Sequence, residues 1–131
     1  IDTPAKWSRY RALFRMHVSL ELIRLYRSFG ALYQKQTAFF YNYPWKRQNL
    51  ESLDTAEQLY RQAYPYWDQA LRHAFEAWSL RSQRLPEVQA WETENWRLMT
   101  EDLDYRKILD ADLRKIERTR RDFQAMGAGT Y

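Results

Sequence analysis

Apolar residues recur every three or four positions through the first third of the chain. This spacing is typical of one face of an amphipathic helix, and Thr3-Pro4 provides a start, with a capping residue before a proline at the first helical position. Leu20 and Ile23 fall outside the stripe, so this helix is predicted to be apolar over more than one face and covered by neighbours. Gly30 is expected to loosen or interrupt it. The stripe consists of Tyr10, Leu13, Phe14, Val18, Leu22, Leu25, Tyr26, Phe29, Leu32 and Tyr33.

The middle of the chain predicts two further helices. A connector is expected at 42–49, because Pro44 pushes the residue before it out of the α region. Asp54-Thr55-Ala56-Glu57 is similar to a capping box and predicts a helix start. Pro65 is expected to break or kink that helix. A helical stripe follows it at Trp67, Ala70, Leu71, Ala74, Phe75 and Trp78.

The last third predicts a crossing segment and a final helix. Leu85-Pro86 ends the preceding element, and the residues up to Trp96 predict a short turn or an extended stretch. Thr100-Glu101-Asp102 can start the last helix, with acids in its first turn. Acid–base pairs four residues apart contribute roughly 0.2–0.5 kcal/mol each and favour a helix partly free of a tight core. The pairs are Asp102/Arg106, Asp110/Arg114 and Glu117/Arg121, and the apolar stripe is Tyr105, Leu109, Leu113, Ile116 and Phe123.

Together these patterns predict an all-α fold, a small bundle of about four helices with extended connectors and a long charged C-terminal helix. The chain has only 3 Gly and no alternating β-branched runs, so strands are not expected. Its 131 residues predict one domain, residues 1–131, with 126–131 as a tail. Because the chain begins with Ile1 rather than Met, a processed or truncated start is expected.

The aromatic content is high for so short a chain. It contains 6 Trp, 10 Tyr and 6 Phe, and a small domain has limited interior room for large rings. Trp and Tyr also suit interfaces, so part of this set is expected to pack on other proteins. The docking candidates are Trp7, Trp45, Trp67, Trp91, Trp96, Arg24 and Arg27.

The net charge of +4 comes with 17 acidic residues mixed among the basic ones, and no dense basic run indicates nucleic-acid binding. The first predicted helix does carry several arginines. They could engage anionic lipid headgroups at a membrane surface, or reach acidic partners within a complex. The second interpretation is favoured because acids such as Glu21 are interspersed. The arginines are Arg9, Arg11, Arg15, Arg24 and Arg27.

Candidate catalytic chemistry is sparse. The absence of cysteine excludes disulfides, thiolate nucleophiles and iron–sulfur ligation. His17 and His73 lack a nucleophile motif and are interpreted as structural. Neither belongs to a Glu-x-x-His metal pair, and there is no glycine-rich phosphate loop. We therefore expect a non-catalytic chain without a metal or cofactor. No apolar run is long enough to span a bilayer.

Two family resemblances follow from the residue order. Leu25-Tyr26-Arg27, after Leu22-Ile23, resembles the first-helix signature of the LYR-motif family of small mitochondrial helical proteins. From about Lys35 to Phe123, the chain resembles the matrix-side helical subunit seven of mitochondrial complex III (ubiquinol–cytochrome c reductase), the ubiquinone-binding protein family. The features that carry it are the acidic start Asp54-Thr55-Ala56-Glu57, the proline turn from Arg61 to Pro65, Leu85-Pro86, Trp91, Glu94-Asn95-Trp96 and the charged helix from Asp104 to Phe123.

This second resemblance implies a non-catalytic accessory subunit that supports assembly and electron transport. It implies a peripheral position on the matrix side of the mitochondrial inner membrane, against cytochrome b and the core subunits. Any effect on quinone would be indirect. The alternatives are an LYR-type accessory subunit of complex I or an assembly factor, and a soluble helical adaptor that binds one protein.

Overall fold

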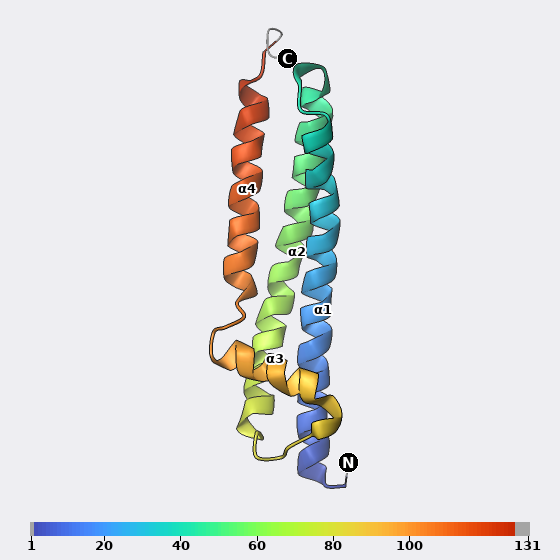
Figure 1. Cartoon of the computed structure of the whole chain (residues 1–131), viewed down its shortest axis with the longest axis vertical. Coiled ribbons are helices and arrows are strands. Elements are labelled where there is room, and N and C mark those ends of the chain that lie inside the picture. The colour runs from blue at the N-terminus through green and yellow to red at the C-terminus, as the bar shows by residue number, and fades with distance from the viewer. Residues whose placement is uncertain (1, 128–131) are drawn as a thin grey trace. The chain divides into compact units, whose positions relative to one another are not determined.

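The computed structural model describes residues 2–127, and these residues form four α-helices and two short 3-10 helices (Figure 1). The prediction of a small all-α bundle of about four helices is confirmed. Most of the expected tail, residues 128–131, lies outside the described residues. The elements are α1 (Pro4–Phe39), η1 (Tyr43–Trp45), α2 (Lys46–Ser79), η2 (Pro86–Val88), α3 (Gln89–Met99) and α4 (Tyr105–Ala125).

α1 begins where the sequence predicts. Thr3 caps it, since Thr3 Oγ1 accepts a hydrogen bond from the backbone N–H of Lys6 (3.2 Å) and Thr3 O accepts one from Trp7 (3.1 Å). The expected interruption at Gly30 is wrong, because α1 continues through it to Phe39.

α2 begins at Lys46 rather than near Asp54, so the predicted start is wrong. The predicted break at Pro65 is also wrong, because Pro65 lies inside α2. Proline removes one helix hydrogen bond, but Ala63 and Trp67 on either side of it are buried, and this packing holds the helix together. Asp54 and Glu57 therefore do not form a capping box. They lie in the helix interior and face α4.

α3 and the start of α4 also differ from the prediction. Residues 89–99 form a regular helix rather than a turn or an extended stretch, and η2 begins at Pro86. α4 begins at Tyr105, not at residue 100. Glu101 adopts the left-handed backbone conformation (φ 62°), which commonly ends a helix, so the segment after Met99 is a turn.

The described residues divide into two compact units, and α1 and α2 contribute to both. Unit 1 comprises residues 2–23 and 65–105. Within it, α3 crosses the first part of α1 and the last part of α2 (Figure 1). The prediction of one domain over 1–131 stays a prediction. The core of unit 1 includes Leu13, Met16, Leu20, Ile23, Trp67, Ala70, Ala74, Ala77 and Leu98.

Unit 2 comprises residues 24–64 and 106–127. The second part of α1, the first part of α2 and α4 lie side by side in it, with α2 antiparallel to the other two (Figure 1). The predicted stripe of α4 is largely confirmed, because Leu109, Ile116 and Phe123 are fully buried. α2 supplies Leu53, Ala56, Tyr60 and Ala63 to this core.

The predicted core stripe of α1 is largely the wrong face. Leu20 and Ile23, placed outside the stripe, are fully buried in unit 1, whereas Phe14 and Val18 are exposed. In unit 2, Leu25, Phe29, Leu32 and Tyr33 are exposed as well. Apolar character over more than one face is confirmed, but one of these faces remains uncovered within the described chain. Among residues 2–127, no helix has the length and apolarity needed to cross a membrane.

Candidate functional site

A groove of about 590 Å³ lies between α1 and α4 in unit 2. Its α1 side carries the small residues Ser28, Ala31 and Ala38, which leave the space open. Lys115 and Thr119 of α4 form much of the other wall. We call this feature the docking groove.

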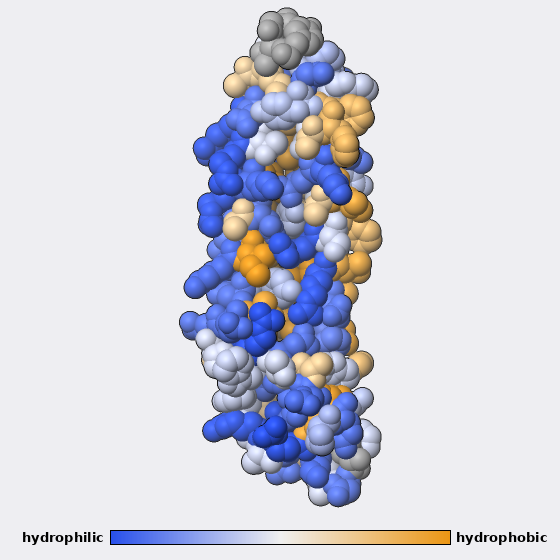
Figure 2. Space-filling view, viewed as in Figure 1, coloured by the Kyte–Doolittle hydropathy of each residue, from blue (hydrophilic) through white to orange (hydrophobic). Residues whose placement is uncertain are grey.

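An exposed apolar row borders the docking groove on the outer face of α1. Leu25, Phe29 and Leu32 are 49%, 46% and 57% exposed, and their spacing of four and three residues is that of a helix–helix seam. Leu32 also lines the groove. Hydrophobic side chains gather over the second part of α1 (Figure 2). Contiguous apolar surface of this kind commonly marks an interaction site.

The charged side chains that line the docking groove are all basic. Lys35 and Lys115 lie on opposite walls, and none of the residues that line the groove is acidic. A lining of small, apolar and uncharged polar side chains with two cations fits a ligand surface that is apolar in part and acidic in part.

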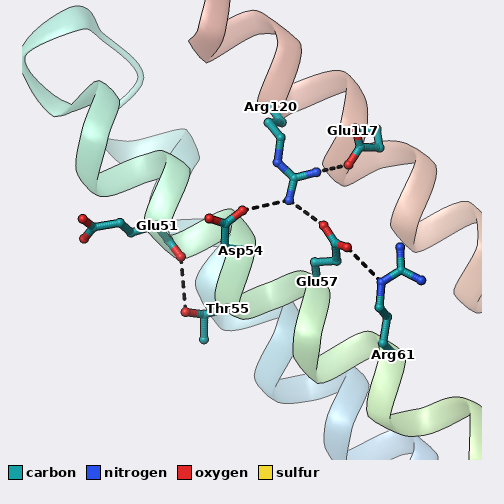
Figure 3. Close-up of polar contacts among 7 residues, drawn as sticks. All are labelled: Glu51, Asp54, Thr55, Glu57, Arg61, Glu117 and Arg120. Carbon is teal, nitrogen blue, oxygen red and sulfur yellow. Dashed lines mark hydrogen bonds and ion pairs between the residues drawn. The ribbon is translucent and has the colours of Figure 1, made fainter.

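α4 is positioned by buried apolar residues and by ion pairs within unit 2 (Figure 3). Arg120 Nη2 donates hydrogen bonds to Asp54 Oδ1 (3.0 Å) and Glu57 Oε1 (2.6 Å) of α2, and Nη1 pairs with Glu117. Hydrogen bonds from Arg61 and Arg120 lower the pKa of the Glu57 carboxyl. Glu117 therefore pairs with Arg120 rather than with the predicted Arg121, and these charges hold α4 on its own chain.

Two further contacts tie α4 to its neighbours. Arg27 of α1 donates hydrogen bonds to both carboxylate oxygens of Asp112 (2.8 and 3.4 Å). Tyr64 of α2 donates one to Asp110 (2.6 Å). Burial and this hydrogen bond raise the pKa of Tyr64 to about 12, so the hydroxyl keeps its proton at physiological pH. These contacts fix the α4 wall of the docking groove.

The turn between α1 and α2 is a second exposed apolar surface. Residues 39–45, which we call the aromatic turn, expose five aromatic side chains, and Phe39 is 77% exposed. The rings of Phe40 and Trp45 lie 4.7 Å apart. The exposed aromatic residues are Phe39, Phe40, Tyr41, Tyr43 and Trp45.

In unit 1, Arg9 is a structural residue rather than a lipid or partner contact. Its side chain is 3% exposed and pairs with Glu92 of α3. It also donates hydrogen bonds to Ala77 O (3.3 Å) and Gln83 O (3.0 Å). The interpretation of the α1 arginines as a lipid-binding set is therefore wrong for Arg9, whose hydrogen bonds are satisfied inside the unit.

The histidines also have structural settings. His17 Nδ1 lies 2.8 Å from Glu94 Oε1, and the imidazole stacks on Trp91 with ring centroids 5.1 Å apart. His73 Nδ1 lies 3.7 Å from a carboxylate oxygen of Glu76. Among the described residues, no group of three or more His, Cys, Asp or Glu side chains could hold a metal ion.

Some of the predicted docking residues are buried in the structure and others are exposed. Trp67 is 4% exposed and packs edge-on against Tyr105, so it belongs to the core of unit 1 and cannot fill a partner pocket. Trp91 is half-buried among rings of α1. Arg24 is half-buried, and Arg27 is held by Asp112. The candidates that remain exposed are Trp7 and Trp96 in unit 1 and Trp45 in unit 2.

Neither the docking groove nor Phe39, the most exposed aromatic residue among residues 2–127, was predicted from the sequence. A usable signal was present, because no Asp or Glu occurs between Glu21 and Glu51. A long helical segment that is apolar and free of acids differs from an ordinary solvent-facing helix, which carries both charges on its outer face.

The family relationship covers nearly all of the described chain. The family model described as Domain of unknown function (DUF8513) matches residues 5–126. The chain belongs to the DUF8513 family. No curated protein and no solved structure matches it. The residues of the docking groove and of the aromatic turn lie inside the DUF8513 match.

Proposed function

We propose that this chain is a non-catalytic docking protein whose groove between α1 and α4 binds an amphipathic helix of a partner protein. The observation that carries the proposal is the exposed row of Leu25, Phe29 and Leu32 beside a groove without acidic residues. The partner helix would place its apolar face on this row and acidic side chains near Lys35 and Lys115.

The row alone does not account for a stable complex. Complete burial of one Leu or Phe side chain contributes roughly 1.5–3 kcal/mol. Because these three are about half exposed, their burial supplies on the order of 2–4 kcal/mol. A micromolar complex needs about 8 kcal/mol. The small residues that line the groove and the lysine contacts must therefore contribute, so the partner has to match the groove in shape and charge.

As the specific assembly we propose a mitochondrial respiratory complex, with complex III on the matrix side of the inner membrane as the first to test. The order of Leu85-Pro86, Trp91 and Glu94-Asn95-Trp96 supports this choice. The start at Asp54 and the turn at Pro65 no longer support it, because both residues lie inside α2. An LYR-type role in complex I or in assembly, and a soluble adaptor, are the alternatives.

The test is site-specific crosslinking in the native host. A photo-reactive residue replaces Leu32 in the tagged full-length chain, and the crosslinked segment is identified by mass spectrometry. The matched control places the same residue at Phe75, an exposed aromatic position of α2 in unit 1. We expect position 32, but not position 75, to capture a helix with an apolar face and acidic margins. Ser at Leu25 and Leu32 should abolish co-purification, whereas Phe75→Ser should not.

The captured protein distinguishes the assemblies. A haem-bearing cytochrome or core subunit in the same isolate supports complex III, complex I subunits support the LYR-type alternative, and a soluble partner supports the adaptor. Capture of a second copy of this chain, or of no protein, at position 32 contradicts a docking role for the groove.

A further inference from the structure

One segment of unit 2 combines exposed aromatic rings with charge of a single sign. From Arg24 to Leu50 the chain contains no Asp or Glu and five basic residues. The aromatic turn lies within this segment. The basic residues are Arg24, Arg27, Lys35, Lys46 and Arg47.

The backbone of the aromatic turn is held by hydrogen bonds. Asn49, which is buried, donates from Nδ2 to Phe40 O (2.6 Å), and Phe40 O also accepts from the backbone N–H of Asn42 (2.8 Å). Lys46 Nζ donates to the carbonyl oxygens of Gln124 (3.2 Å) and Met126 (3.0 Å) at the end of α4. These hydrogen bonds therefore hold the backbone that carries the exposed rings in one conformation.

We propose that the aromatic turn is a membrane-contact surface for an anionic bilayer. It adjoins the docking groove, which Tyr41 also lines. Phe39 and Phe40 would enter the boundary between headgroups and acyl chains, and Trp45 would lie at headgroup level, where Trp and Tyr concentrate. Arg47 would face the lipid phosphates. The side chain of Arg47 is 87% exposed, and its ion pair with Glu51 (3.6 Å) is exposed as well, so the guanidinium can exchange this carboxylate for a headgroup phosphate.

Charge decides between a bilayer and a protein as the occupant. A protein surface offers acids and bases in mixture, whereas the cytoplasmic or matrix face of a membrane that contains anionic lipid is uniformly negative. The nearby acids already have partners in unit 2. Glu51 pairs with Arg47 (3.6 Å), Asp54 pairs with Arg120, and Asp122 lies near Tyr41, whose pKa is raised by burial and by that carboxylate.

The test is sedimentation of the full-length chain with vesicles. One set contains phosphatidylcholine alone, and the other contains phosphatidylcholine with about 30% phosphatidylserine. We expect binding to the anionic set to be about tenfold stronger or more, and to fall when salt shortens the screening length. Serine at Phe39, Phe40 and Trp45 should remove binding. The matched control places serine at Phe75 and Trp96, exposed aromatic positions of unit 1.

A charge variant and a sizing experiment complete the test. Arg47→Glu should sharply reduce the preference for phosphatidylserine and leave the far-UV circular dichroism unchanged. Equal binding of the turn variant and the wild type overturns the proposal, as does equal loss in the unit 1 control. A dimer that forms without vesicles and depends on the aromatic turn also overturns it, because a second copy would then cover the rings. The crosslink from position 32 should persist in the turn variant, so failure of this proposal is distinct from failure of the docking groove.

Discussion

Gly30 of α1 lies directly against the ring of Tyr60 of α2 in unit 2. A Cβ atom at position 30 would lie 2.8 Å from Cζ and 2.9 Å from Cε1 of that ring. The Tyr60 hydroxyl donates a hydrogen bond to Gln34 Oε1 on the next turn of α1. Burial, together with the Asp112 carboxylate, raises the pKa of Tyr60 to about 12. Glycine is thus required here by the close approach of the ring, not by a break in the helix.

We expect Gly30→Ala to destabilise the chain. The new methyl group would overpack the interface, which typically costs about 1–3 kcal/mol, and this outweighs the roughly 1 kcal/mol that alanine contributes in a helix. Urea unfolding followed by far-UV circular dichroism measures the change. The effect should shrink in the Tyr60→Leu background, where the ring is gone. A Gly30→Ala protein at least as stable as the wild type would contradict the steric explanation.

Loss of one partner of the buried Arg9–Glu92 pair should be costly. We expect Arg9→Met to lower the free energy of unfolding by about 3 kcal/mol. It removes the closer of the two arginines beside Glu92, with Arg84 remaining at 3.6 Å, and it leaves the carbonyl oxygens of Ala77 and Gln83 without this donor. Arg11→Met is the control, since the Arg11 side chain is exposed. The double variant Arg9→Met/Glu92→Gln should lose less than the sum of the two single changes. Additive losses would show that the two side chains are not coupled.

The Glu57 carboxylate should make stability depend on pH in the acid range. Its pKa is lowered in the folded state by hydrogen bonds from Arg61 and Arg120. Its contribution is therefore complete above the ordinary value of 4.5, and it is lost as pH falls through the lower folded pKa. We expect Glu57→Gln to cost about 1 kcal/mol near neutral pH and progressively less below about pH 4.

Urea titrations at a series of pH values measure this difference between wild type and Glu57→Gln. The control is Glu51→Gln, because Glu51 is exposed on the same helix and should change stability by less than about 0.5 kcal/mol. A wild-type advantage that grows as pH falls would have the wrong sign for a carboxyl with a lowered pKa.

Truncation of Trp67 should lower the free energy of unfolding far more than truncation of Trp96. Trp67→Ala removes a buried ring from the core of unit 1 and should cost about 3–5 kcal/mol. Trp96 is 53% exposed, so Trp96→Ala should stay within about 0.5 kcal/mol of the wild type. Thermal unfolding followed by circular dichroism separates the two. Equal losses would mean that Trp96 is more deeply packed than its exposed fraction indicates.

The sequence by itself determined the helical class, the start of α1 and the buried face of α4. Thr3 caps the helix with its side chain and Pro4 fixes the backbone angle φ, so the start of α1 depends on local interactions alone. Leu109, Ile116 and Phe123 form the one apolar stripe of a helix that is otherwise charged, so only one face could be buried.

The tertiary structure alone decided which apolar face of α1 is covered, because Leu20 and Leu25 are equally apolar in sequence and only the packing partner distinguishes them. It also decided the fate of Asp54, Glu57 and Pro65. A local reading assigns them to helix ends, whereas packing against α4 and buried neighbours keep them inside α2. A local sequence pattern indicates which secondary structure a segment can form. Burial of its side chains depends on which segments, distant in sequence, pack against it.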